Sequence, residues 1–89
     1  MKFTLVCDWA GFTQQLLDDR FVIVVEAENY KEATERAAHI ALNHYTFLQE
    51  TETPNSFWDG ENGGVILVAH YGDVSGTILD LTTYDVLNG

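Results

Sequence analysis

Hydrophobic and polar residues alternate with a period of two near the start of the chain. Every second residue from Phe3 to Trp9 is apolar, which predicts a half-buried strand. Residues 21–25 (FVIVV) and 65–69 (VILVA) are instead continuous apolar runs. Such runs are typical of strands that are buried on both faces. The pattern therefore predicts three strands in the first 69 residues.

A fourth strand is expected near the end of the chain. Residues 72–76 (GDVSG) are rich in turn formers and indicate a hairpin connection. From Thr77 to Tyr84 the side chains alternate, with Leu79 and Leu81 on one face. The last five residues are expected to form a short tail.

A period near 3.6 residues replaces the alternation after residue 28 and predicts the main helix. Asn29 is a suitable N-cap, and Glu32 stands three residues later as the partner in a capping box. The expected inward face consists of Tyr30, Ala33, Ala37, Ile40, Ala41, His44 and Leu48. Residues 10–19 are compatible either with a wide connection or with a short extra helix at about residues 12–18, in which Phe12, Leu16 and Leu17 would pack inward.

These elements predict a single α+β domain that spans residues 1–89. The order β-β-α-β-β would form a four-stranded, mainly antiparallel sheet with one main helix packed on one face. The other face would carry Val6, Val22 and Val24. An apolar sheet face needs a cover, so dimerisation through this face is one expectation.

Composition changes this picture through charge. The 14 acidic residues and only 4 Lys and Arg give a net charge of −10 on 89 residues. The 46% hydrophobic content indicates a folded domain rather than an acidic tail. The negative sign opposes direct binding to nucleic acid or to an anionic membrane, and it favours a partner protein with a basic surface.

Cellular location is predicted from the cysteine count and from the absence of a leader pattern. Cys7 is the only cysteine, so no internal disulfide forms, which fits a reducing cytoplasm. No signal peptide and no membrane-spanning run are recognisable. The expected location is cytoplasmic, and the host cytoplasm if the protein is encoded by a phage.

Catalytic patterns are not recognisable in the chain, so we expect a protein that is not an enzyme and needs no cofactor. His39 and His44 are five residues apart, whereas four would place both on one helix face as metal ligands. Residues 59–64 (DGENGG) contain oxygen ligands and glycines. A polar turn explains them, and a small cation site is the alternative. No metal site is predicted.

A long loop at residues 51–63 carries the candidate binding residues. Phe57 and Trp58 lie there between turn formers, and two interpretations remain open. The rings either close the edge of the core or form an aromatic anchor for a partner. In the second interpretation the partner-binding set is Phe57, Trp58, Asp59, Glu61, Glu50, Glu52, Asp18 and Asp19.

Two resemblances accompany this interpretation. Residues 21–41 (FVIVVEAENYKEATERAAHIA) resemble a strand–cap–helix unit of small bacterial and phage proteins, including antitoxins of the HicB type. The glycine-rich strand features of that family are missing, so its function does not carry over. In size and charge the whole chain is similar to small acidic phage accessory proteins, such as anti-CRISPR and anti-restriction inhibitors.

The resemblance to phage accessory proteins implies a module that inhibits or modulates a host protein. Its carboxylates would compete with nucleic acid for a basic surface if they converge in the fold, and they would serve only solubility if they scatter. The alternative function is a structural or self-assembling domain that forms a homodimer through its apolar sheet face. A cation-binding module is the third hypothesis.

Overall fold

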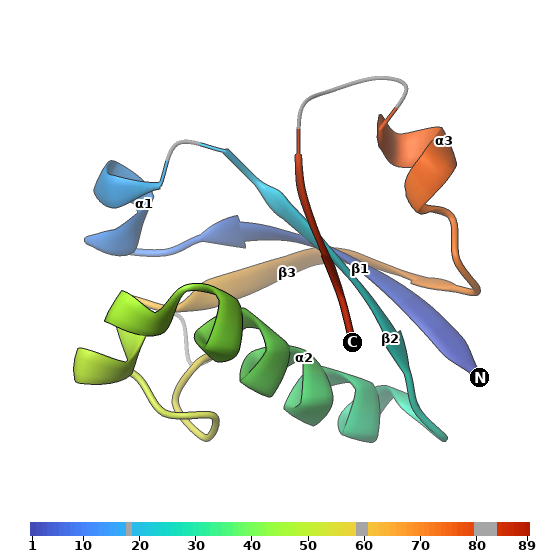
Figure 1. Ribbon diagram of the computed structural model, residues 1–89, viewed down its shortest axis with the longest axis horizontal. Helices are drawn as coiled ribbons and strands as arrows, with labels where there is room; N and C mark the ends of the chain where they lie inside the picture. The colour runs from blue at the N-terminus through green and yellow to red at the C-terminus, as the bar shows by residue number, and fades with distance from the viewer. Residues whose placement is uncertain (18, 59–60, 80–83) are drawn as a thin grey trace.

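The alternating segment at the start of the chain forms β1, a central strand of a four-stranded sheet (Figure 1). The computed structural model describes residues 1–17, 19–58, 61–79 and 84–89. The elements are β1 (Lys2–Trp9), α1 (Thr13–Leu16), β2 (Phe21–Glu26), α2 (Tyr30–His44), the 3-10 helix η1 (Thr46–Glu50), β3 (Gly64–Tyr71), α3 (Ser75–Leu79) and β4 (Asp85–Asn88). The predicted α+β class, the main helix and the short extra helix are confirmed.

The sheet has the strand order β3-β1-β2-β4. β1 pairs antiparallel with both β2 and β3, and its register with β3 shifts between Val6 and Cys7. β2 pairs parallel with β4. Two of the three pairings are thus antiparallel, and β3 and β4 form opposite edges of the sheet.

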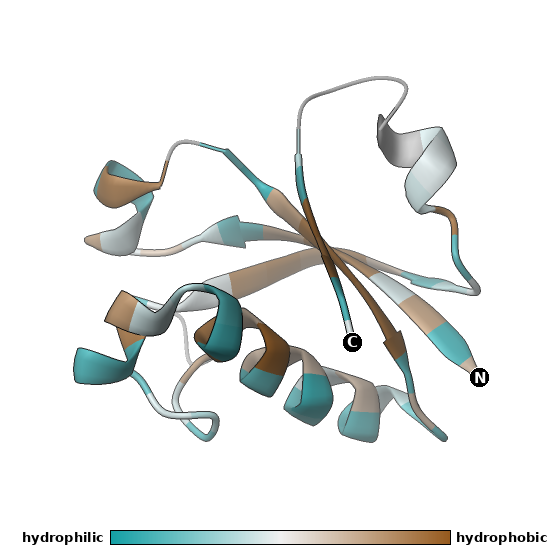
Figure 2. Cartoon of the chain, viewed as in Figure 1, coloured by the Kyte–Doolittle hydropathy of each residue, from teal (hydrophilic) through white to brown (hydrophobic). Residues whose placement is uncertain are grey.

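The main core lies between the sheet and α2. Trp9 stacks on Phe21 with ring centroids 4.2 Å apart, and Tyr45 meets the edge of Trp9 at 5.0 Å. Cys7 is fully buried in this layer, as its place in the alternation predicts. Burial raises the pKa of the Cys7 thiol, which keeps it protonated. In Figure 2 the hydrophobic residues, coloured brown, are concentrated on the strands of the sheet.

The helix α2 begins at the predicted cap, where the Asn29 side chain accepts a hydrogen bond from Glu32 N (2.9 Å). Its buried face differs from the predicted stripe. Ala38 and Leu42 are buried, whereas Tyr30 and His44 are exposed. Because small alanines fill the centre of the contact, the helix packs closely against β2.

The predicted hairpin after β3 is wrong, and so is the strand predicted from residue 77. Residues 75–79 form α3, and residues 80–83 lie outside the described residues. Gly72 adopts φ +81°, which turns the chain away from β3. The Asp73 carboxylate then accepts hydrogen bonds from Ser75 N and Ser75 Oγ, which starts a helical turn and lowers the pKa of Asp73.

The residues expected to form a tail contain the last strand instead. Residues 85–88 form β4, which pairs with β2 at the edge opposite β3. The chain therefore does not return beside β3 but continues to the other side of the sheet. This strand order is the main difference from the predicted topology.

The second face of the sheet is covered by the chain itself. Val22 is fully buried, and Val6 and Val24 are nearly so. Thr4 Oγ1 on this face donates to Gly72 O (2.7 Å) and accepts from Val74 N (3.0 Å). The segment that leads into α3 thus lies on the face opposite α2 (Figure 1). The expectation of an open apolar sheet face is corrected accordingly.

The helices in the described part of the chain are too short or too polar to cross a bilayer.

Candidate functional site

Phe57 belongs to the core rather than to an exposed anchor. Its side chain is 0% exposed, and its ring meets the edges of Trp9 (6.1 Å) and Trp58 (4.7 Å). Trp58 is half-buried, and its indole N–H donates to Thr34 O on α2 (2.8 Å). The two rings fasten the loop to the helix. The interpretation of Phe57 as an aromatic anchor is therefore corrected.

The acidic members of the predicted set occupy different environments. Asp19, Glu50 and Glu61 are exposed, so each can meet a partner. Glu52 is buried and accepts a hydrogen bond from Ser56 Oγ (3.4 Å). That bond places its carboxylate within the loop structure. Asp18 and Asp59 lie outside the described residues, and so does Gly60, so the first two residues of the cation-site alternative at residues 59–64 are not described.

One end of the sheet collects carboxylates from distant parts of the sequence. It is formed where β1 ends, β2 and β4 begin, and the chain leaves α2 through η1 (Figure 1). The loop before β3 joins it there, since Phe12 N donates to Asn62 Oδ1 (2.9 Å) and Ala10 N to Gly63 O (2.9 Å). We call this region the acidic end, and its described carboxylates are Asp8, Asp19, Glu50, Glu52, Glu61 and Asp85.

Arg20 is the only Lys or Arg that the described residues place at the acidic end. Its Nε lies 3.3 Å from Asp8 Oδ2. A hydrogen bond with Tyr84, followed by the charge of Asp8, raises the pKa of Arg20. Asp85 N donates to Arg20 O (3.1 Å), which joins β4 to the start of β2. This cation is thus already engaged, and it offsets only one carboxylate.

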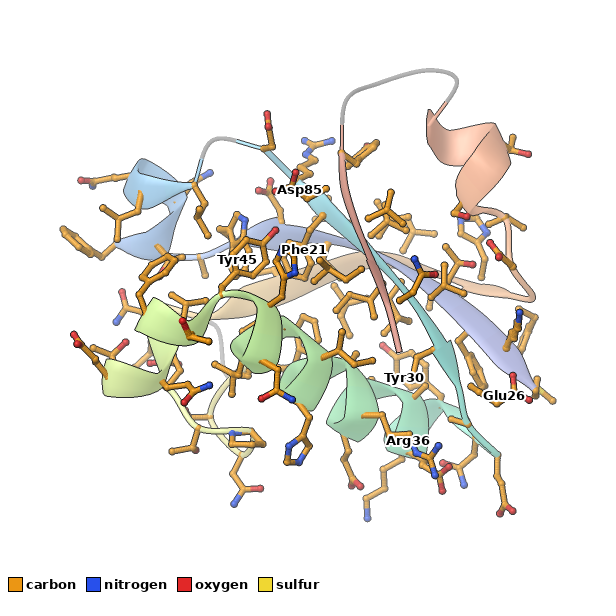
Figure 3. The ribbon with its side chains drawn as sticks, viewed as in Figure 1. Phe21, Glu26, Tyr30, Arg36, Tyr45 and Asp85 are labelled. Carbon is orange, nitrogen blue, oxygen red and sulfur yellow. The ribbon has the colours of Figure 1, made fainter. Side chains whose placement is uncertain are left out.

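Tyr45 connects the acidic end to the core. Its hydroxyl donates to Asp85 Oδ2 at 2.9 Å, and Figure 3 shows the two side chains beside Phe21. Burial is the main cause that raises the pKa of Tyr45, and the hydrogen bond to Asp85 adds to it. The phenol therefore remains protonated and holds the Asp85 carboxylate in place at the rim.

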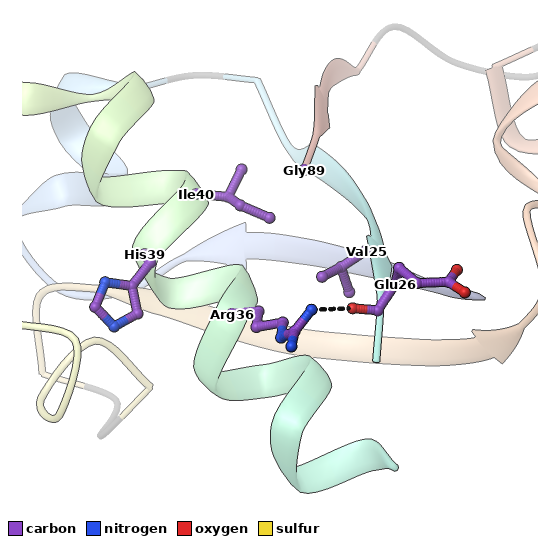
Figure 4. A pocket seen from close by; sticks show the side chains of 6 residues that line it. All are labelled: Val25, Glu26, Arg36, His39, Ile40 and Gly89. Atoms are coloured by element: carbon purple, nitrogen blue, oxygen red, sulfur yellow. Dashed lines mark hydrogen bonds between the residues drawn. The ribbon is translucent and has the colours of Figure 1, made fainter. Parts of the chain in front are cut away.

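The opposite end of the sheet has a more balanced charge. Lys2, Lys31 and Arg36 lie there, where β1 and α2 begin. Arg36 donates from Nη1 to Glu26 O (3.1 Å) and pairs through Nη2 with Glu32 (3.2 Å). A hollow of about 370 Å³ beside Arg36 is lined by Val25, Glu26, Arg36, His39, Ile40 and Gly89 (Figure 4). The charge of Arg36 beside this hollow is therefore already paired with the carboxylate of Glu32.

Exposed apolar side chains also lie at the acidic end. Phe12 is 62% exposed and Leu16 54%, so the expectation that both pack inward is wrong, while Leu17 contacts the core. Phe47 on η1 is 46% exposed. Figure 2 shows hydrophobic residues on both α1 and η1. The apolar residues in the segment 12–18 are visible in the sequence. A helix of four residues is too short, however, for its periodicity to predict which of them face the sheet.

Groups that carry chemistry are dispersed over the described residues. His39, His44 and His70 are exposed on α2 and β3. No three His, Cys, Asp or Glu side chains in the described part gather in a way that could hold a metal ion. The feature that stands out is therefore a surface with negative charge and exposed apolar side chains.

Comparison of the chain with protein-family models, with curated proteins and with solved structures finds no match.

Proposed function

We propose that this protein is a non-enzymatic, acidic protein-binding module that uses its acidic end to occupy a basic surface on a partner. It would act as a phage or mobile-element accessory protein does, inhibiting or modulating a host protein. Phe12, Leu16 and Phe47 would supply apolar contacts, in place of the buried Phe57. Occupying a basic surface would exclude the nucleic acid that normally binds there.

The observation that supports this proposal is the uneven distribution of charge. At the surface of the acidic end there are five described carboxylates (Asp8, Asp19, Glu50, Glu61 and Asp85) and one guanidinium, which gives a charge of −4, since Glu52 is buried. At the opposite end, five carboxylates (Glu26, Glu28, Glu32, Glu35 and Asp73) face three cations, which gives −2. The described charge is therefore concentrated on one side of the molecule.

An uneven field of this kind acts mainly on the rate of association. A surface of one sign raises the on-rate for an oppositely charged partner by about 10–1,000-fold, and salt removes the gain. Counterion release from a basic partner adds to the salt dependence, as it does for phosphates. The apolar side chains would then slow dissociation, since exposed aromatic rings bury much area at a low entropic cost.

The test uses two double variants with the same change in net charge. Asp19→Asn with Glu50→Gln neutralises two exposed carboxylates at the acidic end. Glu28→Gln with Glu35→Gln does the same at the opposite end. Partners are captured from cell lysate at low salt with the wild-type chain and identified by mass spectrometry. The on-rate of the purified partner is then measured for all three proteins in a salt series.

We expect the variant at the acidic end to lower the on-rate by about three- to tenfold at low salt, with a smaller effect from the other variant. A basic oligonucleotide-binding partner should also lose its DNA in a competition assay. Equal effects from the two variants, or binding that does not change with salt, would contradict the proposal.

A further inference from the structure

The edge strand β3 is much more exposed than its sequence suggests. It has eight residues and lies outermost in the sheet, while α2 packs over β2 and β4. Gly64 is buried and Ile66 packs against the core, but every residue from Leu67 to Tyr71 is exposed. Leu67 and Val68 are each 46% exposed and Tyr71 is 76% exposed. Tyr30, on the first turn of α2, adds a half-exposed ring beside the strand.

The main chain of β3 is also available at this edge beyond Gly64, whose N–H already donates to Phe57 O (2.9 Å). Gly72 N donates to Lys2 O (2.7 Å), and this bond shows which residues of β3 point their backbone N–H and C=O groups towards β1 and which point them away from it. His70 and Val68, opposite Thr4 and Val6, therefore bond to β1, and Ala69 and Tyr71 direct their N–H and C=O groups outward. These outward groups form a template for a further strand.

Charge distinguishes this edge from the rest of the surface. Residues 62–72 (NGGVILVAHYG) contain no Asp, Glu, Lys or Arg in a chain of net charge −10. The lysines, prolines and inward charges that usually protect an edge strand are missing as well. Two copies of this protein can thus meet along β3 without bringing carboxylates together.

Two hollows run along the strand between β3 and α2. One, of about 390 Å³, is lined by Tyr30, Thr34, Trp58, Gly64, Val65 and Ile66. The other, of about 100 Å³, is lined by Phe3, Tyr30, Ala69, His70 and Tyr71. Side chains of an added strand would enter them, because successive residues of a strand point to alternate faces.

We propose that β3 pairs antiparallel with β3 of a second copy, which joins the two sheets across a two-fold axis. Such an interface is self-complementary, so one neutral strip serves both subunits. The opposite edge, β4, has only four residues and begins with Asp85, so the assembly stops at two copies. The inference does not depend on the proposed function, since it rests on the uncharged strip at residues 62–72 and not on the carboxylates of the acidic end.

Specific interfaces bury about 1,200 Å² or more in total, and the pairing of one edge strand is a small contact by that standard. A concentration-dependent dimer is therefore expected rather than an obligate one. Sedimentation velocity of the full chain, from low micromolar to millimolar concentration, measures it. Because like charges repel, added salt should strengthen this dimer, whereas it should weaken the capture of a basic partner.

Two variants and one matched control locate the interface. Leu67→Lys places a charge in the neutral strip, and we expect it to raise the dimer dissociation constant by about tenfold or more. Leu16→Lys makes the same substitution at a similarly exposed leucine on α1, and it should leave the constant unchanged. Ala69→Pro removes an outward N–H and should also break the dimer, since edge strands tolerate proline there.

Melting curves accompany each variant to show that it folds. A wild-type chain that remains monomeric at every concentration would overturn the inference. Equal weakening by Leu16→Lys and Leu67→Lys would overturn it as well. If Ala69→Pro does not fold, Leu67→Lys alone decides the outcome.

Discussion

Replacing Phe57 by alanine distinguishes a core residue from a binding anchor. The ring is 0% exposed and contacts the edges of Trp9 and Trp58, so its removal leaves a cavity beneath the loop. The loss of a buried phenylalanine ring costs about 3–5 kcal/mol of unfolding free energy. Since domains have a total stability of about 5–15 kcal/mol, Phe57→Ala should bring the protein close to unfolding at room temperature.

Urea unfolding followed by tryptophan fluorescence suits this measurement, because both tryptophans of the chain pack near Phe57. Phe12→Ala is the matched control, since that ring is 62% exposed, and its effect should stay within about 0.5 kcal/mol. If Phe57→Ala does not fold, Phe57→Leu should still cost about 1–2 kcal/mol. Equal stabilities for Phe57→Ala and Phe12→Ala would refute the assignment of Phe57 to the core.

Two further predictions concern polar contacts. Asn29→Ala removes the cap that accepts from Glu32 N and should lower the unfolding free energy by about 1 kcal/mol in urea, whereas Asn43→Ala, exposed on the same helix, should have little effect; equal losses would contradict the role of the cap. Tyr45→Phe removes the hydrogen bond to Asp85 and should cost about 1 kcal/mol at neutral pH. Because the pKa of Tyr45 is raised in the fold, its stabilisation is complete below the unfolded value of about 10 and is lost as the pH rises above it. Wild-type stability should then fall more steeply with alkaline pH than that of the variant, and parallel pH profiles would show that the phenol is not perturbed.

The sequence pattern predicts which segments are strands better than it predicts their neighbours. FVIVV and VILVA are nearly equivalent runs, yet the first forms the buried strand β2 and the second the exposed edge strand β3. Burial of β3 depends on where α2 packs, which local periodicity does not contain. The alternation at residues 77–84 is likewise insufficient to predict a strand. The Asp73–Ser75 turn starts a helix at residue 75, and β4 pairs with a strand that lies over 60 residues earlier in the sequence.

The candidate site was predictable in composition but not in position. The excess of carboxylates is visible in the sequence, and several acidic residues fall at element ends. Their convergence depends on the strand order, which brings Asp8, Asp19 and Asp85 to one end of the sheet. Of the two interpretations left open for Phe57, burial supports the one in which the ring closes the core, whereas Phe12, which was expected to pack inward, is exposed at the N-cap of α1.

The central place of β1 also determines the sequence in which the chain can fold. β1, the first strand to be synthesised, can pair with β2 early. Its other edge can pair with β3 only after Tyr71, which lies opposite Phe3, has been synthesised. Contacts that span so much of a chain make folding slow, on the order of milliseconds to seconds for two-state domains. A growing chain would therefore hold a β1–β2 hairpin with both edges and both apolar faces uncovered until β3, β4 and α2 are in place. During that interval the risk of misassembly lies at β1, a strand that the finished fold encloses completely.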